Sequence, residues 1–313
     1  MENMNNDFYL ILAGGVGAAK FIEGLANVVR PESLKIIVNT GDDIELFGLN
    51  ICPDLDIITY TLANLVDKEK GWGFIDESFN SLSILKKYYD IGWFNAGDKD
   101  LATHIYRTDL FKQGYTKAEI TKKICEKLNV KSHIIPMCNE NVETYIDTPK
   151  GEIHFEEYFI KECCEPEILN VKFKGIKNAK PVDMVLEYIK NAKKIIICPS
   201  NPIVSIGTIL RVKGIKKSLI KERKKVYAIS PIIKGTTVKG PADKFMRSIG
   251  LEASCVGVAQ FYRDFLGNFI IDNKDCKLKP KIEELGIKTF CFDTLMTNLN
   301  KKKELAQFLI NIE

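Results

Sequence analysis

The sequence of 313 residues lacks the features that mark several classes of protein. No hydrophobic run approaches the roughly 18–20 residues that a helix needs to cross a bilayer. The first seven residues are polar and have no basic stretch of the kind that begins a secretory signal. There is no internal repeat and no low-complexity linker. We therefore expect a soluble, unprocessed, cytoplasmic protein with no membrane partner.

The nine cysteines include no C-x-x-C pair, and their number is odd. Several of them lie inside apolar runs that are typical of strands. The adjacent pair Cys163 and Cys164 is no exception, because neighbouring cysteines rarely bridge each other. These patterns argue against a disulfide framework or a zinc site, and they predict reduced thiols as in cytosolic proteins.

Concentrated positive charge is also missing. The formal net charge is only +4, and the basic residues are scattered through many short groups. A nucleic-acid binder more often shows one basic stripe, so we expect no nucleic-acid partner. The three histidines, His104, His133 and His154, stand alone in the sequence. We predict structural or surface positions for them rather than catalytic ones.

What is present first is a βαβ unit. The apolar run Phe8–Ala13 predicts a strand, and it ends in the turn Gly14-Gly15-Val16-Gly17. Ala18–Val29 has helical periodicity, and Leu34–Val38 predicts a second strand. A strand, a glycine turn, a helix and another strand imply parallel strands.

The same rhythm returns near the carboxyl end of the chain. Strands are predicted at Lys194–Cys198, Lys225–Ile229, Glu252–Val258 and Lys288–Phe292. The stretch 60–175 differs, because it holds helical segments and an alternating segment broken at Pro149-Lys150-Gly151 that predicts a β-hairpin. We predict a single α/β domain over 1–313, with a Rossmann-like, mostly parallel sheet and helices on both faces. Residues 60–175 are predicted to form an inserted helical and β-hairpin subdomain, or lid.

Polar segments follow the predicted strands, and the carboxyl ends of parallel strands are where such sheets bind ligands. In the first, Gly14, Gly15 and Gly17 let backbone N–H groups approach a phosphate at a helix N-terminus. Lys20 stands where a dinucleotide fingerprint has its third glycine, and the G-K-[S/T] ending of a Walker loop is absent. The turn is either a phosphate site or a purely structural one.

The second segment is acidic. Asp42 and Asp43 follow the second strand, and Asp54 and Asp56 come soon after them. Carboxylates beside a phosphate site suit Mg²⁺, which takes one or two of them together with substrate phosphate. Each could instead cap a helix or form a turn. Asp42 or Asp43 could also contact a ribose, as in an NAD-type oxidoreductase.

Three further segments add polar groups. Ser200 and Asn201 could bind a sugar or base, or only cap the next helix. Ser230–Lys244 contains Ser230 and Lys239 in a glycine-bearing loop that could hold phosphate. Phe94–Asp100 carries a group of polar side chains just before a predicted helix; they are Asn95, Asp98 and Lys99.

Together these segments resemble the family of 2-phospho-L-lactate transferases of coenzyme F420 biosynthesis. The resemblance runs nearly end to end and is carried by six motifs. They are LAGGVGAAKF (12–21), NTGDD (39–43), CPDLD (52–56), GDKD (97–100), PSNPIVSIG (199–207) and SPIIKGTTVKGPADK (230–244). Just before its K-G-P-A-D pattern the last motif is more polar than is usual in the family.

The resemblance implies a reaction in which a 2-phospholactyl group moves from lactyl-2-diphospho-5′-guanosine to the ribityl hydroxyl of Fo, a deazaflavin. GMP is released, Mg²⁺ takes part, and the protein is a homodimer. The acyl part of the donor is lactyl, enolpyruvyl or glyceryl among relatives. The alternative is a non-catalytic regulator of a related superfamily that binds nucleotide sugars.

The resemblance also assigns roles to residues. Asp42, Asp43 and Asp56 form the catalytic group, with Asp42, Asp43 and Asp54 near the metal. The Fo site takes Asp56, Asn95, Asp98 and Lys99. Beside it is an aromatic stretch that either packs on the Fo ring or belongs to the core: Tyr88, Tyr89, Trp93 and Phe94. The nucleotide and phosphate site takes Gly14, Gly15, Gly17, Lys20, Ser200, Asn201, Ser230 and Lys239.

Overall fold

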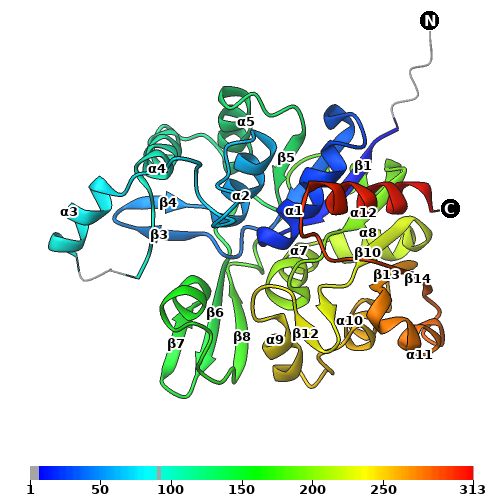
Figure 1. Ribbon diagram of the computed structural model, residues 1–313. Helices are drawn as coiled ribbons and strands as arrows, with labels where there is room; N and C mark the ends of the chain where they lie inside the picture. The colour runs from blue at the N-terminus through cyan, green and yellow to red at the C-terminus, as the bar shows by residue number, and fades with distance from the viewer. Residues whose placement is uncertain (1–6, 90–92, 313) are drawn as a thin grey trace, which may run out of the picture.

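A seven-stranded parallel sheet forms the centre of the molecule in a computed structural model that describes residues 7–89 and 93–312 (Figure 1). Every pairing within this sheet is parallel. In spatial order its strands are β14 (Lys288–Phe292), β13 (Asn268–Asp272), β10 (Val226–Ile229), β9 (Lys194–Ile197), β1 (Tyr9–Ala13), β2 (Leu34–Val38) and β5 (His133–Pro136). The predicted Rossmann-like α/β fold is therefore confirmed.

The strands form because they are short, apolar and rich in β-branched residues, and both of their faces are covered. Along β1, Leu10 and Leu12 enter the core on one face of the sheet. Ile11 and Ala13 enter the core on the other face. All four side chains are fully buried, and each buried aliphatic side chain contributes about 1.5–3 kcal/mol. The alternation along single strands thus holds two helical layers to one sheet.

The helical layers follow from this alternation. The first face is covered by α1 (Gly15–Ala26), α2 (Pro53–Leu62), α5 (Lys117–Lys127) and α12 (Leu299–Asn311). The second face is covered by α6 (Val185–Asn191), α7 (Gly207–Arg211), α8 (Ile215–Lys221), α9 (Ala242–Ser248), α10 (Cys255–Tyr262) and α11 (Lys279–Glu283). Short helical turns join these elements: η1 (Pro31–Ser33), η2 (Glu157–Lys161), η3 (Pro202–Ile206), η4 (Arg223–Lys225) and η5 (Asn273–Leu278).

Several elements lie outside the central sheet. The hairpin of β3 (Ile44–Leu46) and β4 (Leu49–Ile51) extends with α3 (Asn80–Tyr88) and α4 (Asp98–Lys112) to one side (Figure 1). A three-stranded antiparallel sheet comprises β6 (Glu143–Thr148), β7 (Gly151–His154) and β8 (Asn170–Lys174), and a short ribbon comprises β11 (Ile232–Ile233) and β12 (Thr236–Thr237). Within the range 60–175, β5 pairs with β2 in the central sheet. The segments outside the sheet are therefore separated by a core strand.

One predicted strand is wrong. Glu252–Val258 contains the start of α10, because Ser254 accepts a hydrogen bond from the Gly257 amide and caps a helix there. The apolar run that follows is buried on nearly all sides, so it shows no helical periodicity in the sequence. The strand of this region is β13, which starts at Asn268, after the helix.

The expectation that every thiol is reduced is also wrong at one pair. Cys276 in η5 and Cys291 in β14 form a disulfide, because the two elements lie side by side with Cα atoms 5.7 Å apart. The other seven cysteines are free, and Cys163 alone among these seven is exposed. Within 7–89 and 93–312, every helix is too short or too polar to pass through a bilayer.

Candidate active site

A cavity of about 590 Å³ opens at the carboxyl ends of the central strands. It lies where the strand order reverses between β1 and β9, the position at which open parallel sheets bind ligands. The loops after β1, β2, β9 and β10 all reach it. Most of the predicted site residues line it, namely Gly14, Gly15, Gly17, Lys20, Asp42, Asp54, Asp56, Asn95, Ser200, Asn201, Ser230 and Lys239.

The glycine turn packs tightly against the loop after β9. A Cβ atom on Gly17 would lie 2.4 Å from the carbonyl oxygen of Pro199, so no larger residue fits there. Gly15 has a φ of +71°, which glycine adopts without strain. The amide of Gly14 donates to the Ser200 hydroxyl oxygen at 3.3 Å. Because α1 has no acidic residue in its first turn, its N-terminus favours an anion in the cavity.

Two lysines face this end of the cavity. Lys20 lies on α1, and Lys239 lies in the loop that precedes α9. Neither forms an ion pair with any residue of 7–89 or 93–312. Burial lowers the pKa of Lys239, and the charge of Lys20 lowers it further, so the two ammonium groups are close enough to repel. A polyanion between them would remove this repulsion.

Three buried carboxyl groups line the adjacent wall: Asp42, Asp54 and Glu156. Burial raises the pKa of Asp42 well above its usual range, and the charges of Asp54 and Glu156 raise it further. Burial likewise raises the pKa of Asp54 to about 6 and that of Glu156 to about 8. Such a group of carboxylates requires protons or a cation to neutralise it.

The hydrogen bonds of this wall show where a cation would fit. Asp54 accepts from the Gly15 amide at 2.7 Å and from the Asn39 side chain at 2.9 Å. Oδ1 of Asp42 is buried and has no hydrogen-bond partner in the described part of the chain. Buried oxygen ligands without partners are what Mg²⁺ requires, so the donor set of this wall fits that ion.

Asp43 lies apart from these carboxylates. It forms a buried ion pair with Lys117 of α5, with 2.5 Å between Oδ2 and Nζ. It lines a second cavity of about 260 Å³ rather than the main one. Burial would lower the pKa of Lys117, but the Asp43 carboxylate raises it on balance. The structure therefore separates Asp43 from Asp42 and Asp54, which the sequence groups together.

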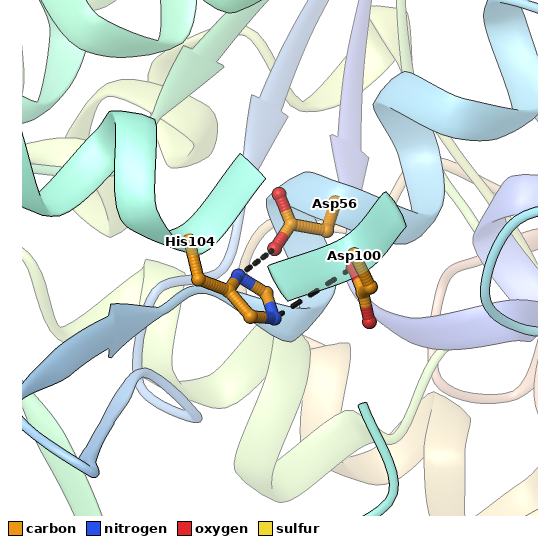
Figure 2. A group of neighbouring side chains, drawn as sticks. All are labelled: Asp56, Asp100 and His104. Carbon is orange, nitrogen blue, oxygen red and sulfur yellow. Dashed lines mark ion pairs between the residues drawn. The ribbon is translucent and has the colours of Figure 1, made fainter. Parts of the chain in front are cut away.

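A cluster from two helices forms the far wall. Asp56 comes from α2, and Asp100 and His104 come from one face of α4 (Figure 2). Arg107 lies on the same face of α4. The His104 ring lies between the carboxylates, with Nδ1 3.6 Å from Asp56 Oδ2 and Nε2 3.6 Å from Asp100 Oδ1. Arg107 pairs with Asp56, and Tyr60 donates to Asp100 Oδ1 at 2.8 Å.

The charges of this cluster are largely balanced. Burial raises the pKa of Asp56, although the nearby Arg107 guanidinium opposes the rise. Burial also disfavours the Asp100 carboxylate, but the nearby imidazole of His104 and the Tyr60 hydroxyl lower its pKa on balance. This cluster does not suit a metal ion. Its two carboxylates face different nitrogens of the His104 ring, and Arg107 already neutralises the Asp56 carboxylate.

Two predicted nucleotide-site residues make structural contacts. Oδ1 of Asn201 accepts from the amides of Ile203 and Val204, so Asn201 caps η3. Its Nδ2 is buried and finds no acceptor in the described ranges. The Ser230 hydroxyl donates to the Ile232 carbonyl oxygen at 2.9 Å. Both residues still line the cavity.

Asp98 and Lys99 do not line the cavity, in contrast to Asn95 of the same segment. Nζ of Lys99 donates to the carbonyl oxygens of Ile75 and Asp76, both at 2.8 Å. Asp98 accepts from the Ser78 hydroxyl, and this and further hydrogen bonds from Asn80 and Ser81 lower its pKa. The two residues therefore join the start of α4 to the 75–81 segment.

The aromatic stretch predicted near the acceptor is only partly at the cavity. Phe94 lines it, but Tyr88 is 76% exposed and Tyr89 packs on Phe47. Trp93 packs edge-on against Phe94. The aromatic side chains that line the cavity come from four segments, and they are Tyr60, Trp72, Phe94, Phe155 and Phe159.

Sequence reasoning missed several residues of the site, including Glu156, Lys117, Asp100, His104 and Arg107. One signal could have found three of them. Asp100, His104 and Arg107 are spaced i, i+4 and i+7, which places them on one face of a helix. Glu156 gives no such signal. It lies between β7 and η2, and the β6–β7 hairpin brings it to the cavity.

Comparison with known proteins identifies the family. The model of the family "2-phospho-L-lactate transferase CofD" matches residues 10–304. The 2-phospho-L-lactate transferase of Methanosarcina barkeri is 37% identical over 303 residues, which cover 97% of this chain and 97% of that protein. The enzyme of the same name from Methanosarcina acetivorans is 36% identical, with 97% and 98% covered. A phosphoenolpyruvate transferase of Streptomyces griseus is 37% identical over 304 residues, with 95% and 96% covered.

Solved structures agree on the fold. Two structures of one Bacillus halodurans protein, described in one of them as a member of the UPF0052 family, have TM-scores of 0.65 and 0.63. Their identities are 17% and 16%, and they cover 97% and 99% of this chain and 99% and 100% of their own. Such identities show the fold alone. Because the family model spans nearly the whole chain and the sequence relatives align from end to end, this chain is a transferase that belongs to the 2-phospho-L-lactate transferase CofD family.

Proposed function

We propose that the protein transfers a 2-phospholactyl group from lactyl-2-diphospho-5′-guanosine to the ribityl hydroxyl of Fo, as a step of coenzyme F420 biosynthesis. The observation that carries this proposal is the division of one cavity into two halves. One half has backbone amides, carboxylates and two lysines without an ion pair among the described residues, which suit a diphosphate with a cation. The other has an ordered carboxylate, imidazole and aromatic side chains, which suit a hydroxyl-bearing ring compound.

The donor half of the cavity would bind the nucleotide part of the donor. We assign the diphosphate to the turn at Gly14, Gly15 and Gly17, together with Lys20 and Lys239, because the N-terminus of α1 and two ammonium groups without an ion pair among the described residues favour negative charge there. The guanosine part then extends toward the loops at 199–201 and 230–231, whose residues line the same end. The buried Nδ2 of Asn201 is a donor for the nucleotide.

Asp42 and Asp54, with Glu156 beside them, would hold Mg²⁺ in this proposal. When bound, the ion supplies positive charge that screens the diphosphate from these carboxylates and stabilises charge on the leaving GMP. The residues themselves fix the wall, since Asp54 is held by the Gly15 amide and by Asn39. Asp43 acts on this wall through its charge, which raises the pKa of Asp42 and Glu156.

At the acceptor half, the ribityl oxygen attacks the phosphorus that carries the lactyl group. The bond from that phosphorus to the bridging oxygen breaks, and GMP leaves with the bonding electrons. Asp56 is placed to accept the hydroxyl proton, because its Oδ2 is buried at the cavity without a hydrogen-bond partner in the described structure. Phosphoryl transfer of this kind depends mainly on positioning and charge stabilisation.

The acyl group of the donor is either lactyl or enolpyruvyl, because relatives named for each group are 37% identical to this chain. The relatives named 2-phospho-L-lactate transferase favour lactyl, and those named phosphoenolpyruvate transferase favour enolpyruvyl. A non-catalytic regulator that binds nucleotide sugars, the alternative that the sequence leaves open, is the second candidate. The buried Asp56 and His104 pair favours catalysis, because a binding module has no need of a proton acceptor beside an open cavity.

The decisive experiment mixes the purified protein with Fo and the lactyl donor, and follows GMP release and the new phosphodiester by mass spectrometry. We expect turnover with Mg²⁺ and its loss by at least about 100-fold with EDTA. The enolpyruvyl donor, run in parallel, ranks the two acyl groups by kcat/KM. Nucleotide binding without transfer from either donor would support the regulator instead. We also propose a homodimer, which light scattering would test.

A further inference from the structure

Arg107 makes contacts that determine the state of two cavity groups. Its side chain is buried between α2, α4 and β4, with only 3% of the residue exposed. One terminal nitrogen, Nη2, donates to Asp56 Oδ1. The other, Nη1, lies 3.2 Å from Nδ1 of His104 and 3.2 Å from the carbonyl oxygen of Asn50. One guanidinium thus contacts both the carboxylate and the imidazole.

A guanidinium can only donate hydrogen bonds, so the nitrogen that faces it must accept. Accepting that hydrogen bond requires a lone pair on Nδ1 of His104, which in the neutral imidazole places the ring proton on Nε2. Nε2 lies 3.6 Å from Asp100 Oδ1, which is too long for a hydrogen bond. It is buried and has no hydrogen-bond partner among the residues described.

The same guanidinium divides the roles of the two Asp56 oxygens. Oδ1 is occupied by Nη2, whereas Oδ2 is buried with no hydrogen-bond partner in the described ranges. Tyr60 meanwhile fixes Asp100 through a 2.8 Å hydrogen bond to Oδ1. Asp56 and His104 both line the cavity. Two atoms of this cluster thus have no hydrogen-bond partner among the described residues: an acceptor, Asp56 Oδ2, and, in that tautomer, a donor, the Nε2–H of His104. A hydroxyl group requires one of each.

We propose that Arg107 is a positioning residue that holds His104 as the Nε2–H tautomer and directs the free oxygen of Asp56 toward the acceptor hydroxyl. The identity of that hydroxyl rests on the proposed function; the tautomer does not. His104 then donates to the substrate oxygen while Asp56 accepts its proton. Figure 2 shows the His104 ring between Asp56 and Asp100, with Nδ1 toward Asp56 and Nε2 toward Asp100.

The tautomer is tested without any substrate. Imidazole ¹⁵N NMR at pH 8 distinguishes the two neutral tautomers and the imidazolium, and the His104→Gln variant identifies the His104 signals among those of the three histidines. We expect a protonated Nε2 and an unprotonated Nδ1. A protonated Nδ1, alone or as part of an imidazolium, would overturn the proposal whether or not the protein turns over Fo.

Kinetics of two His104 variants supply the second readout. The amide nitrogen of glutamine reaches the place of Nε2, whereas that of asparagine reaches only the place of Nδ1. We expect His104→Gln to exceed His104→Asn in kcat by at least about 10-fold, with the KM of the donor equal in both. Equal activity of the two variants would overturn the donor role. Absence of turnover by the wild-type protein would refute the proposed function and leave the NMR result standing.

Arg107 is tested through a variant that keeps the cluster neutral. Arg107→Met alone leaves a buried Asp56 charge unpaired and can unfold the protein, so it is paired with Asp56→Leu, which removes the charge and places no new donor beside Nδ1. In the folded double variant, we expect the His104 tautomers to become mixed, because the only donor to Nδ1 among the described residues is gone. An unchanged Nε2–H tautomer in that variant would show that Arg107 does not position the ring.

Discussion

The two halves of the cavity are built by different means. The donor half uses backbone and small side chains at the carboxyl ends of β1, β2 and β9, where a fixed turn follows each strand. The acceptor half uses long side chains of α2 and α4 that contact one another, since Asp56 of α2 lies against Arg107 and His104 of α4. Charges also differ. Within the described residues, Lys20 and Lys239 form no ion pair and Asp42 Oδ1 has no hydrogen-bond partner, whereas Asp56 and Arg107 form an ion pair.

This difference teaches how each half gains its specificity. Unpaired charges in the donor half make the apo site electrostatically strained, and a polyanion with a cation would relieve that strain on binding. The acceptor half is organised before its ligand arrives, because its ion pair and hydrogen bonds hold the side chains in place. Substitutions should therefore act mainly on charge in the first half and on geometry in the second.

The largest effect is expected for Asp42→Asn. Removing this carboxylate takes away an oxygen that is buried at the cavity and has no hydrogen-bond partner within the described residues, so we expect kcat to fall by at least about 100-fold. Steady-state kinetics over a Mg²⁺ titration measure it. Glu45→Gln is the matched control, because Glu45 belongs to the same acidic segment but is exposed and lines the second cavity. Near wild-type turnover of Asp42→Asn would contradict the inference that the donor half depends on its charged groups.

The next effect tests the backbone turn itself. In Gly17→Ala, the new Cβ meets the Pro199 carbonyl oxygen at 2.4 Å, and the loop after β9 must move. We expect nucleotide affinity to fall about 10-fold or more, measured by calorimetry with GDP. Gly24→Ala on the same helix is the control, since its Cβ would meet the Lys302 carbonyl oxygen at 2.4 Å, away from the cavity. Both variants should lower Tm, and weakened GDP binding by Gly24→Ala alone would contradict the assignment.

The same contrast explains what the sequence could predict. The donor half was predictable because β1, its glycine turn and α1 are consecutive, and the sheet rule places separate turns at one edge. The acceptor half was not predictable, because Asp56 and Arg107 are 51 positions apart in the sequence and lie on different helices. They meet only through the packing of these helices. His104 stands alone in the sequence, whereas in the structure its partners lie on its own helix face and on α2.

Helix caps differ in how clearly the sequence marks them. Thr116 begins α5 with a capping box, and Glu119 stands three residues after it as such a box requires, whereas Ser254 caps a helix inside an apolar run that predicts a strand. Asp43 shows a further limit: its sequence neighbours suggest a metal site, but its charge is paired with Lys117 from 74 positions away. Sequence patterns thus locate turns and caps, and they fail where a partner comes from a distant element.

A smaller effect is expected in stability for Glu156→Gln. Burial raises the pKa of Glu156 from the ordinary 4.5 to about 8, so the folded protein binds this proton more tightly than the unfolded chain. The carboxyl group therefore costs nothing below pH 4.5, costs progressively more up to pH 8, and carries its full penalty above that. In EDTA we expect the variant to exceed the wild type in Tm by roughly 5 °C at pH 8.5 and to match it at pH 4.5.

The exposed Glu165→Gln variant controls for the change of net charge and should show no pH-dependent difference in Tm. A second measurement adds Mg²⁺ at pH 8.5, which should raise the Tm of the wild type more than that of Glu156→Gln. If Glu156→Gln and the wild type differed by the same amount at both pH values, burial of this carboxylate would not be the source of strain in the donor half.

The smallest effect is expected for Lys99→Met, and it separates the resemblance from the geometry. The resemblance places Lys99 on the acceptor, whereas Nζ bonds to the carbonyl oxygens of Ile75 and Asp76. We expect the acceptor KM to change less than about 3-fold and the free energy of unfolding to fall by about 1 kcal/mol. Asn95→Ala, from the same segment but at the cavity, should raise the acceptor KM by about 10-fold. A larger KM effect from Lys99→Met than from Asn95→Ala would mean that the start of α4 rearranges around the acceptor, so that this half is not organised in advance.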